Sequence, residues 1–158
     1  MSTRKAKERR PKQKPAAQLE AGRAAFMAGK FDTAREIWMP LAESGDAEAQ
    51  AWIGSLYANG DGVEIDDSVA FAWYVKSAEG GNVQAQSNVG AAYAMGSGVK
   101  QDHEAAVRWF ERAAKNGDAH GQFNLAVLLS SGAGVAKDLA KAAEWYRAAA
   151  EGGHYPSQ

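Results

Sequence analysis

The chain repeats one pattern every 36 residues, and this period restricts its fold more than any other feature of the sequence. Glycine, valine, aspartate and tryptophan return in three successive units with no insertion between them. The recurring sets are Gly60, Gly96 and Gly132; Val63, Val99 and Val135; Asp66, Asp102 and Asp138; and Trp73, Trp109 and Trp145. A period of this length is typical of solenoids, in which each unit covers an apolar face that its neighbour would otherwise expose.

Each unit is predicted to form two helices. In the first, around residues 47–58, apolar side chains follow helical spacing and give a single stripe. This stripe consists of Ala49, Ile53, Leu56 and Tyr57. The second helix is expected to begin after the recurring aspartate, because a carboxylate at that position accepts hydrogen bonds from the free amides of the first helical turn.

Two kinds of turn join these helices. Within a unit the loop has the form G-x-G-V-x-x-D, in which the glycines permit positive φ and the valine can return to the core. Between units, Gly81-Asn82 and Gly117-Asp118 each supply a glycine that ends one helix and an N-cap that begins the next. Junctions this short favour antiparallel neighbours. The sequence therefore predicts an all-α fold, a right-handed α/α superhelix of about four helix–turn–helix repeats.

The repeat extends upstream with a shorter hairpin. Ala34, Trp38 and Gly45 keep the 36-residue register, while Gly29 stands in a turn that lacks the G-x-G-V pattern. We expect residues 16–45 to form an N-terminal cap repeat of tetratricopeptide type. Three regular repeats then occupy 46–81, 82–117 and 118–153, and residues 154–158 begin a further repeat or a tail.

The first fifteen residues differ from the rest in charge. They contain seven basic side chains against the single acidic Glu8, so the remaining residues have an excess of acidic groups. The basic residues are Arg4, Lys5, Lys7, Arg9, Arg10, Lys12 and Lys14. With no large apolar side chain after Met1, residues 1–15 are predicted to be a disordered basic arm. A solvating tail is the favoured interpretation; contact with nucleic acid, an anionic membrane or an acidic protein is an alternative, and a mitochondrial presequence is a third.

Composition argues against several classes of protein. The chain has no cysteine, and its three histidines lack the spacing of metal ligands, so we expect neither a structural metal nor a cofactor. There is no apolar run of about 18 residues and no secretory signal pattern, which makes the cytoplasm the expected location.

The repeating unit resembles the Sel-one-like repeat family, relatives of the tetratricopeptide repeat. The clearest copy runs from Val83 to Gly117, and the resemblance covers about residues 17–153. It implies a non-catalytic adaptor that scaffolds protein complexes, often in bacterial signalling or membrane-associated degradation machinery. The third copy departs from the pattern at Gly121, Ala126 and Leu129, which suggests looser packing there.

Catalytic motifs carry little weight in this sequence. Ser97-Gly98-Val99-Lys100 matches the S-x-x-K nucleophile motif, and some members of the family are linked to β-lactam binding, so a β-lactam-binding or hydrolytic enzyme is a distant third alternative. The same positions in the flanking repeats, 61–64 and 133–136, keep neither the serine nor the lysine. No phosphate-binding loop and no zinc-protease helix is present, and we expect no small-molecule substrate.

The best candidates for a binding surface are first-helix positions that the repeat does not require. Trp52, Asn88 and Asn124 stand 36 residues apart and should form a column on the concave face. Asparagine can donate to and accept from an extended peptide, and Trp52 can anchor a partner or pack on the cap repeat. The full predicted set is Trp52, Ser55, Asn59, Asn88, Ala91, Met95, Asn124 and Leu128. The tryptophans at 73, 109 and 145 are instead predicted to be core residues.

The sequence thus favours an adaptor that binds another protein, as a peptide or a helix, on its concave surface. The alternative is contact of the basic arm with nucleic acid or anionic lipid.

Overall fold

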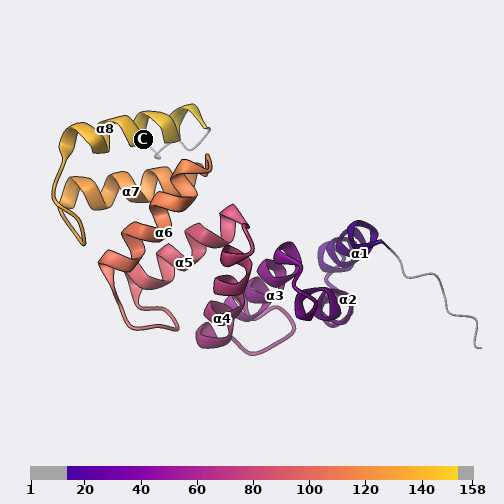
Figure 1. Cartoon of the computed structure of the whole chain (residues 1–158). Helices are drawn as coiled ribbons and strands as arrows, with labels where there is room; N and C mark the ends of the chain where they lie inside the picture. Colours follow the sequence, from indigo (N-terminus) through magenta and orange to yellow (C-terminus); the bar gives the residue numbers. More distant parts are fainter. Residues whose placement is uncertain (1–13, 153–158) are drawn as a thin grey trace, which may run out of the picture.

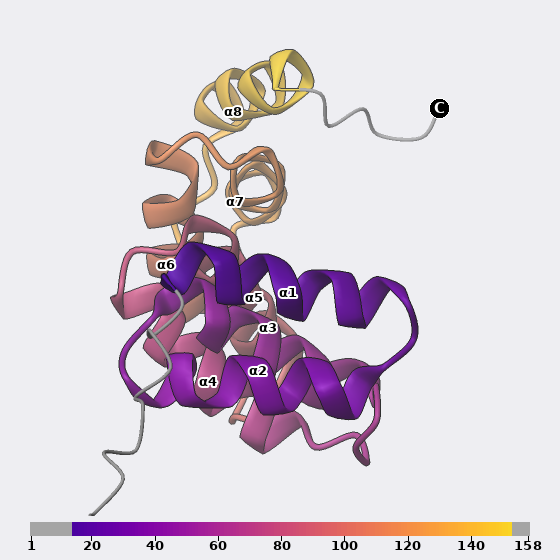
Figure 2. The same ribbon diagram turned by 90° about the vertical axis from the view of Figure 1, so that its right-hand side faces the viewer.

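The computed structural model describes residues 14–152, and within this range it contains eight helices of 13 residues each and no strand. In chain order they are α1 (Pro15–Met27), α2 (Phe31–Glu43), α3 (Ala47–Asn59), α4 (Asp67–Glu79), α5 (Val83–Met95), α6 (His103–Lys115), α7 (Ala119–Ser131) and α8 (Leu139–Glu151). They form four helical hairpins stacked one after another (Figures 1 and 2). The predicted α/α superhelix is confirmed.

The predicted N-caps begin the helices of the regular repeats. The side chains of Asp46, Asn82 and Asp118 cap α3, α5 and α7, and the recurring aspartates cap α4, α6 and α8. Each accepts a hydrogen bond from a backbone N–H three residues later, at 2.8–3.1 Å. These bonds satisfy amides that have no partner within the helix, and they fix where each helix starts.

Within the first three hairpins an aromatic side chain occupies a notch left by glycine on the facing helix. The ring of Tyr74 lies against Gly54, and that of Phe110 against Gly90, so that a Cβ at either glycine would come within 2.9 Å of the ring. In the N-terminal hairpin, Trp38 fills the space above Gly22. Its indole Nε1 donates to the Leu19 carbonyl at 3.3 Å, and the side chain is fully buried.

Buried glutamines join successive hairpins. The side-chain nitrogens of Gln50, Gln86 and Gln122 donate to backbone carbonyls of the preceding helix, at Ala42, Ala78 and Ala114, over 3.0–3.3 Å. Those carbonyls lie at helix C-termini, and each also accepts a hydrogen bond from the backbone N–H of the glycine three residues later, at 3.1 Å. The three glutamines recur every 36 residues because each junction requires this bond.

The hairpin loops also contact the preceding repeat. The second glycine of each loop, at 62, 98 and 134, lies on the first residue of the second helix one hairpin earlier. These glycines have φ of 70–73°, and a Cβ on Gly62 would lie 2.7 Å from Phe31 Cβ. Each loop therefore both closes its own hairpin and covers its neighbour.

The predicted core is confirmed in part. Phe110 is buried, as are Ala126 and Leu129 of the third repeat, so the departures from the family pattern lie within the core, and the looser packing there stays a prediction. Trp73, Trp109 and Trp145 pack against the buried clusters but stay partly exposed. Cationic groups of Lys76 and Arg112 lie 4.6 Å from the rings of the first two. The tryptophan position is thus at the edge of the core and not inside it.

Candidate functional site

Two adjoining pockets lie where α3, α4 and α5 meet, and they share Tyr74 and Asn88. One, here called the Trp52 pocket, encloses about 390 Å³ and also involves α1. The other, the Asp67 pocket, encloses about 220 Å³. Side chains of α3 and α5, the first helices of two successive repeats, therefore form most of a continuous surface.

The Trp52 pocket combines an aromatic wall with polar groups. Besides Trp52 it is lined by Arg23, Glu48, Ser55, Gln84 and the two shared residues. Arg23 Nη2 lies 2.8 Å from Glu48 Oε1, so the charges of this pair are matched within the protein. The Gln84 and Asn88 side chains form no hydrogen bond with any of residues 14–152 and remain available to a ligand.

Trp52 itself is held by the N-terminal hairpin. Its ring stacks on Trp38 with a centroid separation of 4.7 Å and an interplanar angle of 17°, and Phe26 lies 5.4 Å away. The ring remains partly exposed toward the pocket. Trp52 thus packs on the cap repeat, and part of its ring is exposed; that it anchors a partner stays a prediction.

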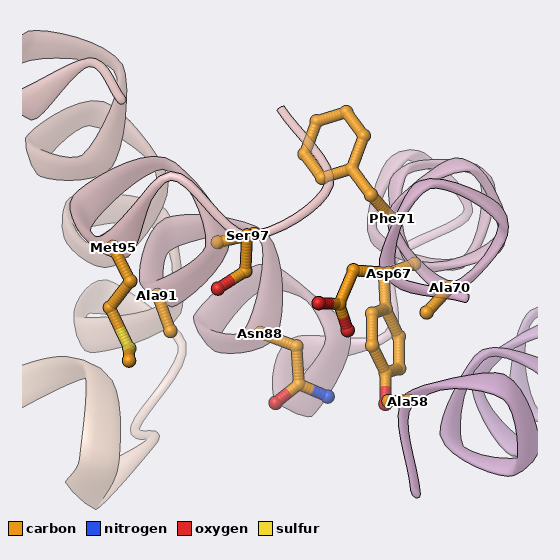
Figure 3. A pocket seen from close by; sticks show the side chains of 10 residues that line it. Ala58, Asp67, Ala70, Phe71, Asn88, Ala91, Met95 and Ser97 are labelled. Atoms are coloured by element: carbon orange, nitrogen blue, oxygen red, sulfur yellow. The ribbon is translucent and has the colours of Figure 1, made fainter. Parts of the chain in front are cut away.

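The Asp67 pocket is polar on one wall and apolar on the other. Asp67, from the start of α4, faces Asn88, Ala91 and Met95 of α5, with Ser97 of the following loop nearby (Figure 3). Ser97 precedes Gly98, whose contact with the Asp67 backbone brings the loop to this place. Phe71 completes the lining and packs edge-on against Tyr93 at 5.3 Å.

Tyr74 separates the two pockets and is partly withdrawn from water. Burial raises the pKa of its hydroxyl, and a hydrogen bond from Ser55 opposes that rise without cancelling it. Ser55 Oγ also accepts a hydrogen bond from Asn59 Nδ2 at 3.2 Å. Tyr74 therefore stays protonated at neutral pH and acts as a polar but uncharged wall.

The structure brings five of the predicted surface residues together: Trp52, Ser55, Asn88, Ala91 and Met95 line the two pockets. Asn59 contacts the site only through Ser55. Asn124 lies one repeat further along on α7, outside both pockets, and Leu128 is only 8% exposed and belongs to the core. Leu128 was therefore wrongly placed on the groove, because it stands two periods after Leu56, which is also a buried core residue.

The predicted groove left out Arg23, Glu48, Asp67, Phe71 and Tyr74, and Ser97 was considered only as part of the S-x-x-K motif. The prediction used only the first helix of each repeat and so left out α4, although the first turn of α4 reaches the Asp67 pocket. A usable signal existed at position 67, where the equivalent residues are Phe31, His103 and Leu139, so the aspartate is not required by the repeat.

The other predicted site residues belong to the basic arm and to the S-x-x-K motif. In the basic arm, Arg4, Lys5, Lys7, Arg9, Arg10 and Lys12 lie outside the described residues, whereas Lys14 is exposed at the N-cap of α1 and Pro15 is already helical. Of the S-x-x-K motif, Ser97 lines the Asp67 pocket and Lys100 is exposed beyond its lining.

Residues 14–152 contain neither a cluster of metal ligands nor a helix that could span a membrane. No group of three or more histidine, cysteine, aspartate or glutamate side chains there could hold a metal ion. None of the helices in this range is long and apolar enough to cross a membrane. The cytoplasmic location stays a prediction.

The three regular hairpins match a known repeat. Residues 47–82, 83–118 and 119–154 each match the Sel1 repeat model. The chain belongs to the Sel1 repeat family. No curated protein matches it. Proteins with Sel1 repeats generally mediate protein–protein interactions, and their fold is typically a non-catalytic scaffold.

Solved Sel1 repeat structures resemble the whole described fold. A Sel1 repeat protein from Oxalobacter formigenes is 34% identical, with a TM-score of 0.81 over 85% of this chain and 55% of that one. The protein c5321, a protective antigen present in uropathogenic Escherichia coli strains, is 39% identical, with a TM-score of 0.83 over 88% of this chain and 31% of its own. This chain thus spans about half and a third of their lengths. Cysteine rich protein B of Helicobacter pylori, 22% identical with a TM-score of 0.62 over 80% of this chain and 91% of that one, shares the fold.

Proposed function

We propose that this protein is an adaptor that binds an extended segment of another protein across the two adjoining pockets. The observation that carries the proposal is the position of Asn88 between them, on a face where the repeat itself requires no particular side chain. Its amide has no hydrogen-bond partner among residues 14–152 and offers both a donor and an acceptor. A peptide backbone needs both.

An extended peptide fits this arrangement better than a helix does. Side chains at alternate positions of a strand point the same way, roughly 7 Å apart, so two of them can enter neighbouring pockets while the intervening backbone lies over Asn88. A helix would turn its backbone amides inward, where the Asn88 side chain cannot reach them.

The test is selection of a phage-displayed library of random linear dodecapeptides on the full chain. Peptides are expected to enrich on the wild type, to lose binding to Asn88→Arg, and to keep it with Asn124→Arg. The second substitution introduces the same side chain at the equivalent position of α7, outside the pockets, and so serves as a matched control. Peptides that bind Asn88→Arg as tightly as wild type would place recognition elsewhere, and failure to enrich any peptide counts against the proposal.

A second candidate rests on the charge of residues 1–15. Seven basic side chains in so short a segment favour contact with nucleic acid or anionic lipid. Binding to DNA fragments or to phosphatidylserine vesicles should weaken steeply with salt and disappear when residues 2–13 are deleted. Binding that survives the deletion contradicts this role for the arm.

A further inference from the structure

We propose that the Asp67 pocket selects a lysine or arginine side chain of the bound segment, an inference that rests on the proposed peptide-binding function. Asp67 is the one residue of the pocket lining that is charged at neutral pH. Its carboxylate forms no hydrogen bond or ion pair with any of residues 14–152, and no basic side chain lines the pocket. A carboxylate left open in this way attracts a cationic group.

Two further acceptors surround the carboxylate. The Asn88 side-chain oxygen and the Ser97 hydroxyl line the same pocket, and neither makes a hydrogen bond with residues 14–152. Lysine and arginine are donors only, and their several N–H groups need acceptors from more than one direction. The pocket therefore offers a charged acceptor and two neutral ones.

The opposite wall fits the aliphatic part of such a side chain. Met95 is 75% exposed at the pocket edge, and Ala91 and Phe71 extend the apolar surface inward. Long basic side chains characteristically lay their methylene stems on apolar surface while the charged end stays with polar groups. A cavity of roughly 150 Å³ accommodates a benzene molecule, so the Asp67 pocket, at about 220 Å³, has room for one such stem.

The adjoining Trp52 pocket does not offer an unpaired carboxylate, so we assign the basic side chain of the ligand to the Asp67 pocket only. There the Glu48 carboxylate already pairs with Arg23 at 2.8 Å, and Arg23 also contacts Glu20 at 3.1 Å. A basic ligand side chain would have to compete with Arg23 in that pocket. Among the carboxylates that line the two pockets, Asp67 is the one with no basic partner in residues 14–152, so the preference for a basic residue should appear at a single position of the bound peptide.

The repeat register shows that this aspartate is not part of the fold. N-capping of α4 is done by Asp66, and the residues equivalent to Asp67 in the other hairpins are phenylalanine, histidine and leucine. Met95 likewise stands where Asn59 and Ser131 stand in the neighbouring repeats. The pocket thus combines side chains that stacking does not demand.

The experiment compares the peptides selected by four full-length proteins from the same dodecapeptide library. Wild type should enrich peptides with lysine or arginine at one fixed position. Asp67→Asn should remove that preference and lower the affinity of the wild-type peptides about fivefold. Asp67→Lys should select aspartate or glutamate at the same position. Glu104→Gln is the control, because it removes a carboxylate from the first turn of α6 outside the pocket and should change nothing.

The outcomes separate this inference from the proposed function. Peptides that depend on Asn88 but show no basic position, or keep it in Asp67→Asn, overturn the inference and leave peptide binding intact. If Glu104→Gln also loses the basic preference, the inference is overturned, because the effect then reflects the net charge of the protein and not the Asp67 pocket.

Discussion

The contact between glycine and an aromatic ring inside each of the first three hairpins makes a prediction that opposes helix propensity. Alanine is favoured over glycine in a helix by about 1 kcal/mol. Yet a Cβ at Gly90 would lie 2.8 Å from two carbons of the Phe110 ring. Gly90→Ala is expected to lower the free energy of unfolding by about 1–3 kcal/mol, because the buried ring has no free space to move into. Urea denaturation measures the difference.

The equivalent position of the third repeat provides the control. There the chain already has Ala126, which is fully buried. Ala126→Gly is expected to be destabilising as well, by about 1 kcal/mol, through lost propensity and a small void. A Gly90→Ala protein more stable than wild type would show that the ring adjusts freely.

Tyr74 predicts how stability responds to alkaline pH. Burial raises the pKa of its hydroxyl above the ordinary 10.0 despite the hydrogen bond from Ser55. The folded protein therefore retains this proton when the unfolded chain has lost it, so the stabilisation is complete below about pH 10 and declines as pH rises further. Tyr74→Phe should flatten this decline while slightly lowering stability near pH 8, where Ser55 loses its partner.

Urea unfolding of both proteins at pH 8 and between pH 10 and 11 checks the expectation for Tyr74. Parallel curves for wild type and Tyr74→Phe over that range would contradict it.

At the scale of elements, the loop between α5 and α6 offers two glycines with nearly equal backbone conformation. Gly96 and Gly98 have φ of 71° and 73°, so alanine is strained by a similar amount at each, about 1–2 kcal/mol. A Cβ at Gly96 would contact only Gln101, at 3.3 Å or more, whereas one at Gly98 would collide with the backbone of Asp67 and Ser68. Gly98→Ala should therefore destabilise the protein more than Gly96→Ala.

The same pair of variants tests whether the loop holds two repeats together. Hydrogen exchange should increase at the start of α4 in Gly98→Ala but remain as in wild type there in Gly96→Ala. Equal exchange in the two variants would mean that the loop contact contributes nothing across the junction.

Helices and their order could be predicted from the sequence because the signals are local. An aspartate N-cap and a left-handed glycine act within one turn of chain, and the predicted starts at Asp66, Asp102 and Asp138 agree with the structure. The glutamine bonds and the contacts of the loop glycines link residues about eight to thirty positions apart. Their recurrence was visible, but their purpose depends on how one hairpin lies on the next.

At the scale of the whole molecule, the candidate site likewise combines positions that the sequence predicts with positions that depend on how one hairpin packs on the next. The column through Trp52 and Asn88 follows from the period alone. Asp67 reaches the pocket only because α4 begins beside the loop of the following repeat, and Leu128 is buried in a cluster that joins α6, α7 and α8. Such placements depend on the angle between hairpins, which no short motif encodes.

Stacking of neighbours also determines how the molecule should unfold. The helices pack mainly against those adjacent to them in the chain, so the core consists of separate clusters and not of one centre. Trp38→Ala, which empties the cluster nearest the N-terminus, costs about 3–5 kcal/mol. Hydrogen exchange should rise in α1, α2 and α3 and remain as in wild type in α7 and α8.

Leu129→Ala, in the cluster nearest the C-terminus, should show the reverse pattern: it costs about 2–5 kcal/mol and loosens α7 and α8 while α1 and α2 stay protected. The two variants together distinguish local from global cooperativity, since each serves as the other's control. If either one raises exchange equally in all eight helices, the hairpins unfold as a single unit, and the nearest-neighbour description of this solenoid is wrong. If each variant raises exchange only near its own end of the chain, the pockets around α3, α4 and α5 lie in the middle of the molecule, between hairpins that stabilise them from both sides.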